Sequence, residues 1–230
     1  MISVPPAAAR RSVLQTFTDF ALAFLAASAL GAVLTGCAGP QIYSNSQHQS
    51  ISLKSGSLRQ GGVAFITPST VTGQEEDKQA LALAVGKLMC EKIPGARCVS
   101  LASSLGLING SGLAPDYKKM YEEYRDTGIF KRETLKRIGE VTRTRYLIQL
   151  KLASFVQGSK SRFGVFGLRI VDTSTSNIRL FFQVWDSSDG SVAWEGSEEL
   201  SYAFETAAEQ NAAFRSVVEE AANRIIANLP

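Results

Sequence analysis

The order of apolar patterns along this chain predicts an α/β fold, in which a mixed β-sheet with a C-terminal meander packs against helices. Three observations lead to this prediction. Two short apolar runs flank an amphipathic stretch after residue 62, alternating stretches follow in series between 145 and 185, and an amphipathic segment closes the chain. We therefore expect a single α/β domain over residues 62–230, a length typical of one domain.

The first strand, helix and strand of this domain have clear boundaries. Val63–Thr67 is an apolar run that stops at Pro68, as expected of a buried strand. Acidic residues from Glu75 onward favour a helix start, because negative charge is stabilised at the positive end of the helix dipole. Pro94 ends this helix, and residues 97–101 form the second expected strand. The apolar face of the helix consists of Leu81, Val85 and Leu88.

The middle of the chain is more polar and is expected to be largely helical. Residues 103–112 are interpreted as a loop. Residues 116–125 and 134–142 carry apolar or aromatic side chains three and four positions apart, which is the spacing of one helix face. These stripes are expected to pack on the core, and a ligand-binding surface is the alternative. The first stripe comprises Tyr117, Met120, Tyr121 and Tyr124.

Alternating stretches at 145–155, 162–172 and 177–185 predict three strands in series. A turn with Gly190 then returns the chain into residues 191–195, because glycine accepts the positive φ that tight turns require. The last element is an amphipathic helix. Its apolar face is Phe214, Val218, Ala221 and Ile225.

Two groups of side chains near this turn have structural interpretations. Trp185 and Trp194 lie on opposite arms of the hairpin and are expected to pack in the core or against each other. An exposed binding hot spot is the alternative. Glu195, Glu198 and Glu199 are interpreted as the solvated face of an edge strand.

A cleaved signal peptide is expected over residues 1–36. Arg10 and Arg11 form a positive n-region, and the apolar stretch over residues 20–34 is shorter than the roughly 20 residues of a membrane-spanning helix. The signal ends on Leu34, Thr35, Gly36 and Cys37, which resemble the lipobox of bacterial lipoproteins. This resemblance implies that Cys37 carries diacylglycerol and a fatty acid such as palmitate, and Ala38 implies sorting to the outer membrane. An ordinary secretory signal or a short transmembrane helix is the alternative.

Residues 37–61 are expected to form the lipidated N-terminus and a flexible tether, because they are rich in Ser, Gln, Asn and Gly. A partly ordered strand, for example at 50–53, is the alternative. With Cys37 acylated, Cys90 and Cys98 remain as a pair. A pair of cysteines in an oxidising compartment predicts a disulfide, and two buried thiols are the alternative.

Charge and composition exclude several functions. The formal net charge is +3, whereas a dedicated nucleic-acid-binding domain normally has a strong basic excess. The single histidine, His48, falls in the expected tether, so Ser–His and Cys–His catalytic arrangements lack their base. The sequence has no phosphate-binding loop and no nucleophile elbow. We therefore expect no catalytic residues, no metal site and no cofactor.

One segment has a concentration of positive charge that suits a partner surface. Docking on an acidic protein face, or on anionic wall or lipid groups, is one interpretation of this cluster, and a solvated helix face is the other. The basic residues are Lys131, Arg132, Lys136, Arg137, Arg143 and Arg145.

Two patches resemble a group of small periplasmic envelope lipoproteins. The first is residues 144–148, Thr-Arg-Tyr-Leu-Ile, after a helix, and the second is the hairpin from Val184 to Gly196. The group includes relatives of the curli-secretion protein CsgG, the penicillin-binding-protein activator LpoB and the N-terminal domain of TolB. The resemblance implies a non-enzymatic adaptor and supplies no catalytic residues.

Together these features lead to one functional expectation and one alternative. We expect an outer-membrane lipoprotein that binds another envelope protein in the periplasm, in wall synthesis or secretion. The alternative is a self-assembling ring or scaffold subunit of an export complex, and thus a homo-oligomer.

Overall fold

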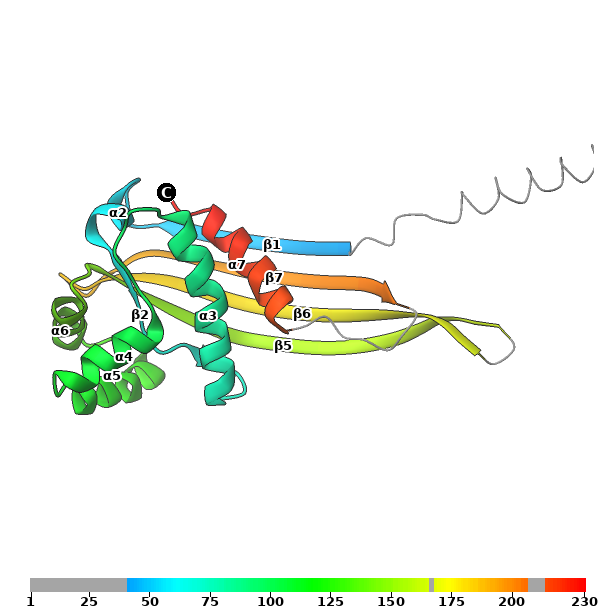
Figure 1. Cartoon of the computed structure of the whole chain (residues 1–230), viewed down its shortest axis with the longest axis horizontal. Coiled ribbons are helices and arrows are strands. Elements are labelled where there is room, and N and C mark those ends of the chain that lie inside the picture. Colours follow the sequence, from blue (N-terminus) through cyan, green and yellow to red (C-terminus); the bar gives the residue numbers. More distant parts are fainter. Residues whose placement is uncertain (1–40, 166–167, 207–213) are drawn as a thin grey trace, which may run out of the picture. The chain divides into compact units, whose positions relative to one another are not determined.

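A computed structural model describes residues 41–165, 168–206 and 214–230. It confirms the α/β fold: a seven-stranded mixed sheet packs against helices (Figure 1). Cys37 and the rest of the expected lipobox and signal lie outside the described residues. None of the helices in the described ranges is long and apolar enough to cross a membrane.

The sheet has an antiparallel half and a parallel half. Its strands lie in the order β1-β7-β6-β5-β2-β4, and β3 pairs with β5 beside this path. The pairs β1–β7, β7–β6 and β6–β5 are antiparallel, whereas β2 and β3 are parallel to β5, and β4 is parallel to β2. The strands are β1 (Gln41–Ser50), β2 (Val63–Phe65), β3 (Ser69–Thr70), β4 (Cys98–Val99), β5 (Tyr146–Val165), β6 (Leu168–Asp186) and β7 (Val192–Thr206).

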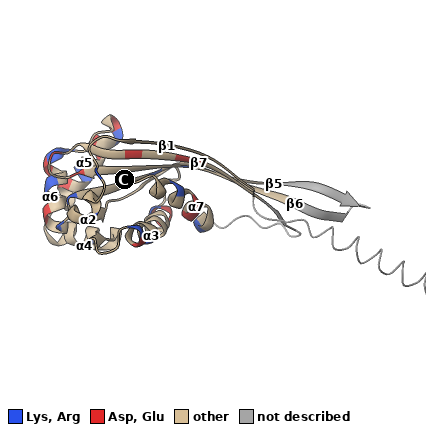
Figure 2. Cartoon of the chain, turned by 90° about the horizontal axis from the view of Figure 1, so that it is seen from above, with Lys and Arg blue, Asp and Glu red and all other residues tan. Residues whose placement is uncertain are grey.

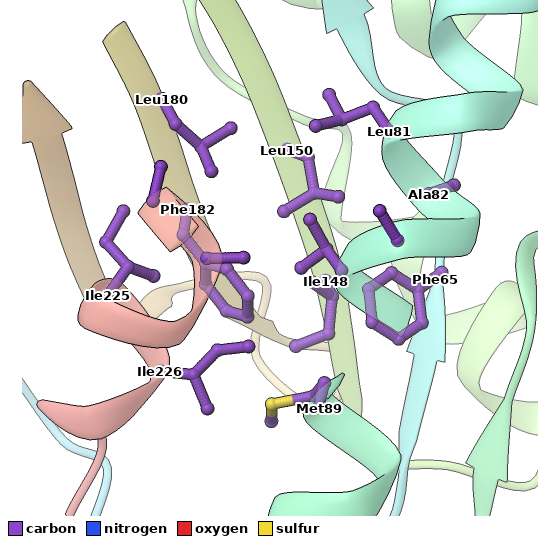
Figure 3. Packing of buried hydrophobic residues seen from close by; sticks show 14 of the residues in the cluster. Phe65, Leu81, Ala82, Met89, Ile148, Leu150, Leu180, Phe182, Ile225 and Ile226 are labelled. Carbon is purple, nitrogen blue, oxygen red and sulfur yellow. The ribbon is translucent and has the colours of Figure 1, made fainter. Parts of the chain in front are cut away.

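Helices cover the two faces of the sheet at different places. One face packs against α3 and α7 through a large apolar cluster that includes Leu150, Leu180 and Phe182 (Figure 3). The other face packs against α4, α5 and α6, at the parallel half, through a second cluster that includes Leu147 and Trp185. The helices are α2 (Ser57–Gly61), α3 (Glu75–Lys92), α4 (Leu101–Gly110), α5 (Ala114–Thr127), α6 (Arg132–Thr142) and α7 (Phe214–Ala227).

The expected tether over 37–61 is largely replaced by regular structure. Residues 41–50 are strand β1, which pairs with β7 over its whole length, and residues 57–61 are helix α2. Residues 41–61 accordingly belong to the same compact unit as the rest of the described chain. Local composition failed to predict the strand because nearly all of its side chains are exposed, so its order comes from backbone pairing with a distant segment.

The expected loop at 103–112 was also wrong, because residues 101–110 form helix α4. Its buried residues, Leu101, Ser104 and Ile108, recur at helical spacing, and the hydroxyl of Ser100 caps its first turn by accepting from the Ser103 amide. Three glycines and three serines within 103–112 made the segment look irregular, whereas packing against the sheet stabilises the helix.

The meander has fewer and longer strands than expected. The segment 162–172, expected to be one strand, instead contains the end of β5 and the start of β6, which pair as one long hairpin. Trp185 and Trp194 are both buried, as expected of core residues. They do not face each other, because a register shift after Val184 places Trp194 opposite Val184 and Trp185 opposite Val192. The two indoles therefore belong to the clusters on opposite faces of the sheet.

Candidate functional site

The six predicted basic residues lie at one end of the sheet, along helix α6 and the start of β5, and all six are exposed. Figure 2 shows Lys and Arg gathered on this helix. Helix α6 is strongly amphipathic: Leu135 and Ile138 bury its inner side against the second apolar cluster. Its charged side is thereby presented to solvent, as a rigid surface and not as a mobile loop.

Two of these side chains have carboxylate partners. Arg137 forms an ion pair with Asp116 of α5. Arg145 donates to the carboxylate of Asp186 through Nε at 2.9 Å and Nη2 at 2.7 Å. Burial would raise the pKa of Asp186, but hydrogen bonds from Arg145 and Ser188 outweigh it, and the pKa of this carboxyl is lowered. Asp186 also accepts from the Ser188 amide, an arrangement typical of aspartate in turns.

The other four basic residues, Lys131, Arg132, Lys136 and Arg143, form no ion pair within the described ranges. We call these four the free basic surface. Glu133 and Glu140 also lie exposed on α6 and dilute the positive charge, but neither is within ion-pair distance of these four cations, which stay available to an anionic partner.

Arg143 has an unusual backbone conformation. Its φ of 53° makes it the one non-glycine residue with positive φ among those the structure describes. It follows the last turn of α6, where a left-handed residue ends the helix and glycine is the usual choice. A side chain at this position costs about 1 kcal/mol in conformational energy. A guanidinium therefore stands at a position where glycine would cost less conformational energy.

A tyrosine-lined groove lies near the carboxyl ends of β2 and β3. Tyr117 accepts from the Thr67 amide at 2.8 Å, and Tyr121 donates to the Thr67 carbonyl at 2.7 Å. Burial raises the pKa of Tyr117 and raises that of Tyr121 well above its ordinary value, so both phenols stay protonated. The groove has a volume of about 760 Å³ and includes Lys78, Lys118 and Lys151 in its lining. Met120 is buried in the second apolar cluster and the three tyrosines pack against it, so the expected packing role of the stripe is confirmed.

Glu198 of β7 is a buried charge that the sequence did not reveal. Its interpretation as part of a solvated face was wrong, because β1 covers β7 and α7 packs above it. The side chain is fully buried, and one carboxylate oxygen accepts from Ser46 of β1. The other oxygen has no hydrogen-bond partner among the described residues. Burial raises the pKa of Glu198, although Ser46 and Arg224 of α7 act in the opposite direction.

This carboxyl makes stability depend on pH. Because its pKa is raised in the folded state, its contribution is fully present below the unfolded pKa and is lost as pH rises through the folded pKa. We expect Glu198→Gln to raise the free energy of unfolding at pH 7 by about 1 kcal/mol and to flatten its decline above about pH 4. Urea unfolding at a series of pH values measures both effects. The control is Glu199→Gln on the opposite, exposed face; an identical response there would contradict the assignment.

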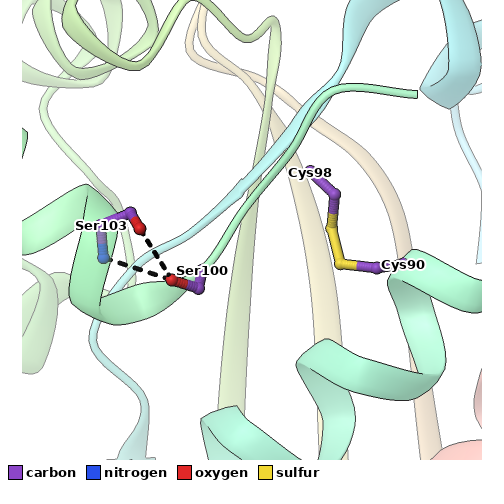
Figure 4. Close-up of a disulfide and its surroundings, with 4 residues drawn as sticks. All are labelled: Cys90, Cys98, Ser100 and Ser103. Carbon is purple, nitrogen blue, oxygen red and sulfur yellow. Dashed lines mark hydrogen bonds between the residues drawn. A yellow bond between two sulfur atoms is a disulfide. The ribbon is translucent and has the colours of Figure 1, made fainter. Parts of the chain in front are cut away.

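The expected disulfide is present between Cys90, in the last part of α3, and Cys98 of β4 (Figure 4). Their Cα atoms are 5.8 Å apart, and eight positions separate them in the sequence. The bond ties α3 to the edge strand β4 across the turn at Pro94 and Gly95.

We expect the double variant Cys90→Ser and Cys98→Ser to lose about 2.5 kcal/mol of unfolding free energy, from the loop-closure entropy of so short a ring. Denaturant titration of the wild type with and without a reductant provides the measurement. Equal stability of oxidised and reduced protein would contradict this expectation.

The remaining sequence expectations concern chemistry. His48 lies exposed on β1, where its ring stacks on Trp194 with centroids 6.3 Å apart. Within the described ranges, no group of three His, Cys, Asp or Glu residues is placed to hold a metal ion. The expectations of no catalytic residues and no cofactor stay predictions.

Comparison with known proteins gives structural likenesses at low identity. No protein-family model and no curated protein matches the sequence. Among solved structures, the chain is similar to the PelC dodecamer from Paraburkholderia phytofirmans, at 10% identity over 83% of this chain and 97% of that one, with a TM-score of 0.43. It is also similar to lipoprotein GNA1162 from Neisseria meningitidis, at 10% identity over 72% and 97%, with a TM-score of 0.36. We infer function below from this chain's own residues.

Proposed function

We propose that this protein is a lipid-anchored, non-enzymatic adaptor of the bacterial outer membrane, whose domain faces the periplasm and binds another envelope protein in wall synthesis or secretion. The lipobox ending at Cys37 supports the anchor. The Cys90–Cys98 disulfide supports an oxidising compartment. The resemblance to CsgG, LpoB and the N-terminal domain of TolB stays a prediction.

The position of the free basic surface suits an adaptor. Gln41, four residues after Cys37, begins β1, and Ser50 at the other end of this strand pairs with Trp194, close to the turn that α6 contacts through Arg132. Ten residues of strand separate the two ends by roughly 30 Å. The proposed anchor at Cys37 is therefore joined to the Gln41 end of β1, and α6 lies near the other end of this strand.

The observation that carries the proposal is the free basic surface, and above all the left-handed Arg143 within it. Non-glycine residues in the left-handed conformation cluster at functional sites, and this supports a contact of the Arg143 side chain outside the fold. We therefore assign an acidic surface of the partner protein to these four cations.

Cross-linking in intact cells, followed by identification of the captured proteins, tests the proposal. We expect the native chain to capture a wall-synthesis or secretion component, and Cys37→Ala to lose both this capture and the membrane fraction. Charge reversal by Lys136→Glu should weaken capture, whereas Lys87→Glu, an exposed lysine on α3 at the other face, should not. Capture that is unchanged in Cys37→Ala and in Lys136→Glu would refute the adaptor.

Arg143→Gly separates stability from binding. We expect the free energy of unfolding of this variant to be about 1 kcal/mol higher than that of the wild type, because glycine accepts the left-handed conformation without a Cβ clash. We also expect it to bind the captured partner several-fold more weakly, because one unpaired guanidinium is lost. Urea titration and a binding isotherm in low salt give the two values. A stabilised variant with unchanged affinity would remove Arg143 from the interface.

A self-assembling scaffold is the second candidate. It is favoured by one specific observation, the long open edge of the sheet at β1. This function predicts that cross-linking recovers only the chain itself.

A further inference from the structure

Strand β1 leaves one side of its backbone without a partner. Its ten residues pair with β7, and no strand pairs with its other side within the part of the chain that the structure describes. In an antiparallel ladder, every second residue directs its N–H and C=O to one side. About half of the polar backbone groups of β1 therefore face outward along the edge.

This edge lacks the features that normally keep sheet edges apart. Natural edge strands are protected by lysines, prolines, bulges or short length. Strand β1 has the sequence Gln-Ile-Tyr-Ser-Asn-Ser-Gln-His-Gln-Ser, with no Lys, Arg, Asp, Glu or Pro. Its register with β7 runs from Gln41 to Ser50 without a shift, so the strand has no bulge. It is long, regular and uncharged, and such a strand is a template for another strand.

We propose that β1 pairs antiparallel with β1 of a second copy of this chain, so that two sheets become one across a twofold axis. A twofold axis perpendicular to the sheet keeps the same face of both copies on the same side. Because side chains alternate between the two faces, residues that lie opposite each other must be an even number of positions apart. One residue of β1 therefore lies opposite its own copy. The longest possible overlap pairs nine of the ten residues and places Asn45 or Ser46 on the axis.

The side chains are compatible with this self-pairing. With Ser46 on the axis, Asn45 lies opposite Gln47 of the second copy, and Tyr43 lies opposite Gln49. The first pair joins two amides, the second joins an aromatic ring to an amide, and no like charges meet. The edge has no charge that would repel a second copy and none that would select a charged strand of another protein. This argument favours a second copy over another protein.

Anchoring strengthens the contact, and this part rests on the proposed lipidation of Cys37. A pair of strands is marginal by itself in water. Two copies held at one membrane surface meet at a much higher effective concentration than two free domains. The pairing should therefore be stronger in membranes than in the unanchored Cys37→Ala protein.

Single added cysteines in the full-length chain test the pairing in cells, because Cys90 and Cys98 are already bonded to each other and the proposed acylation blocks Cys37. The chain without an added cysteine is the blank, and it must stay monomeric for a cross-link to count. Asn45→Cys and Gln47→Cys are treated with a short bis-maleimide, and we expect a product of twice the mass for both. Ser197→Cys is the matched control: Ser197 lies directly opposite Gln47 on β7, one strand further from the edge. It should give at least tenfold less dimer.

A second experiment adds a charge at one residue of β1 and measures cross-linking at another. Gln47→Lys, combined with Asn45→Cys, should reduce the dimer several-fold, because it adds the edge charge that prevents strand pairing. Ser197→Lys with Asn45→Cys should leave the yield unchanged. Monomer at every position, equal cross-linking of Ser197→Cys, or a product with the mass of another protein would each overturn the proposal.

Membrane fractionation of the same cells keeps this result separate from the proposed function. A chain that dimerises but is not in the membrane fraction contradicts the anchor and leaves the pairing supported. An anchored chain that stays monomeric contradicts the pairing alone.

Discussion

Gly139→Ala is expected to destabilise the protein by about 3 kcal/mol and to detach helix α6 from the sheet. A Cβ on Gly139 would lie 2.9 Å from the backbone oxygen of Thr144 and 2.7 Å from Cβ of Ser187. Real Cβ atoms do not approach other atoms so closely, and a backbone oxygen cannot swing away as a long side chain can. Overpacking of a buried site of this kind typically costs about 1–3 kcal/mol, and here the rigid backbone contact favours the upper end.

This substitution also affects the free basic surface, which α6 carries. We expect the variant to show a lower urea midpoint and weaker capture of the partner, both from displacement of the helix. Gly106→Ala in α4 is the control, because a Cβ there meets nothing within 4 Å and alanine is the better helix former. A Gly139→Ala protein as stable as the Gly106→Ala protein would show that α6 is not packed as described.

Trp194→Ala is expected to cost about 3–5 kcal/mol, the range for truncating a buried tryptophan. Trp194 is fully buried in the larger apolar cluster and meets Phe182 edge-on, with ring centroids 5.8 Å apart. Its ring also lies over Gly196, where an added Cβ would meet the indole. Removal of the ring leaves a cavity between β7 and the helices that the rigid sheet cannot close.

Trp194→Phe separates packing from hydrogen bonding. The indole nitrogen has no hydrogen-bond partner among the described residues, so its loss removes no bond. We expect the phenylalanine variant to retain most of the stability, with a loss of about 1–2 kcal/mol from the smaller ring. In chemical unfolding, we expect the free energy of unfolding to decrease in the order wild type, Trp194→Phe, Trp194→Ala. Equal losses of this free energy in both variants would contradict the packing role.

The sequence predicted the elements whose own side chains form an apolar pattern. The strand at Val63, the helix from Glu75 and the stripe on α6 are all present, because each buries one regular face against the sheet. Strand β1 was missed for the opposite reason. Of its ten residues only Ile42 is even half-buried, so no local pattern distinguishes it from a polar tether. Its structure depends on β7, which lies far along the chain.

The candidate site was predicted in part. The basic residues on and beside α6 were found because all six fall within residues 131–145, and the structure adds which of them are already paired. The backbone conformation of Arg143 has no sequence signal, since it is set by the way α6 meets β5. Glu198 was misinterpreted because burial of a carboxylate depends on β1 and α7, which approach it from opposite ends of the chain.

The pairing of β1 with β7 has a consequence for how this protein matures. Ser46 and Glu198 contact each other across 152 positions of sequence. A chain synthesised from its N-terminus exposes its first strand long before the partner strand follows. High contact order slows folding, because the entropy of closing so large a loop must be lost before the contact forms. Residues 41–50 would therefore be the last strand to pair, and until then they are accessible to chaperones and proteases.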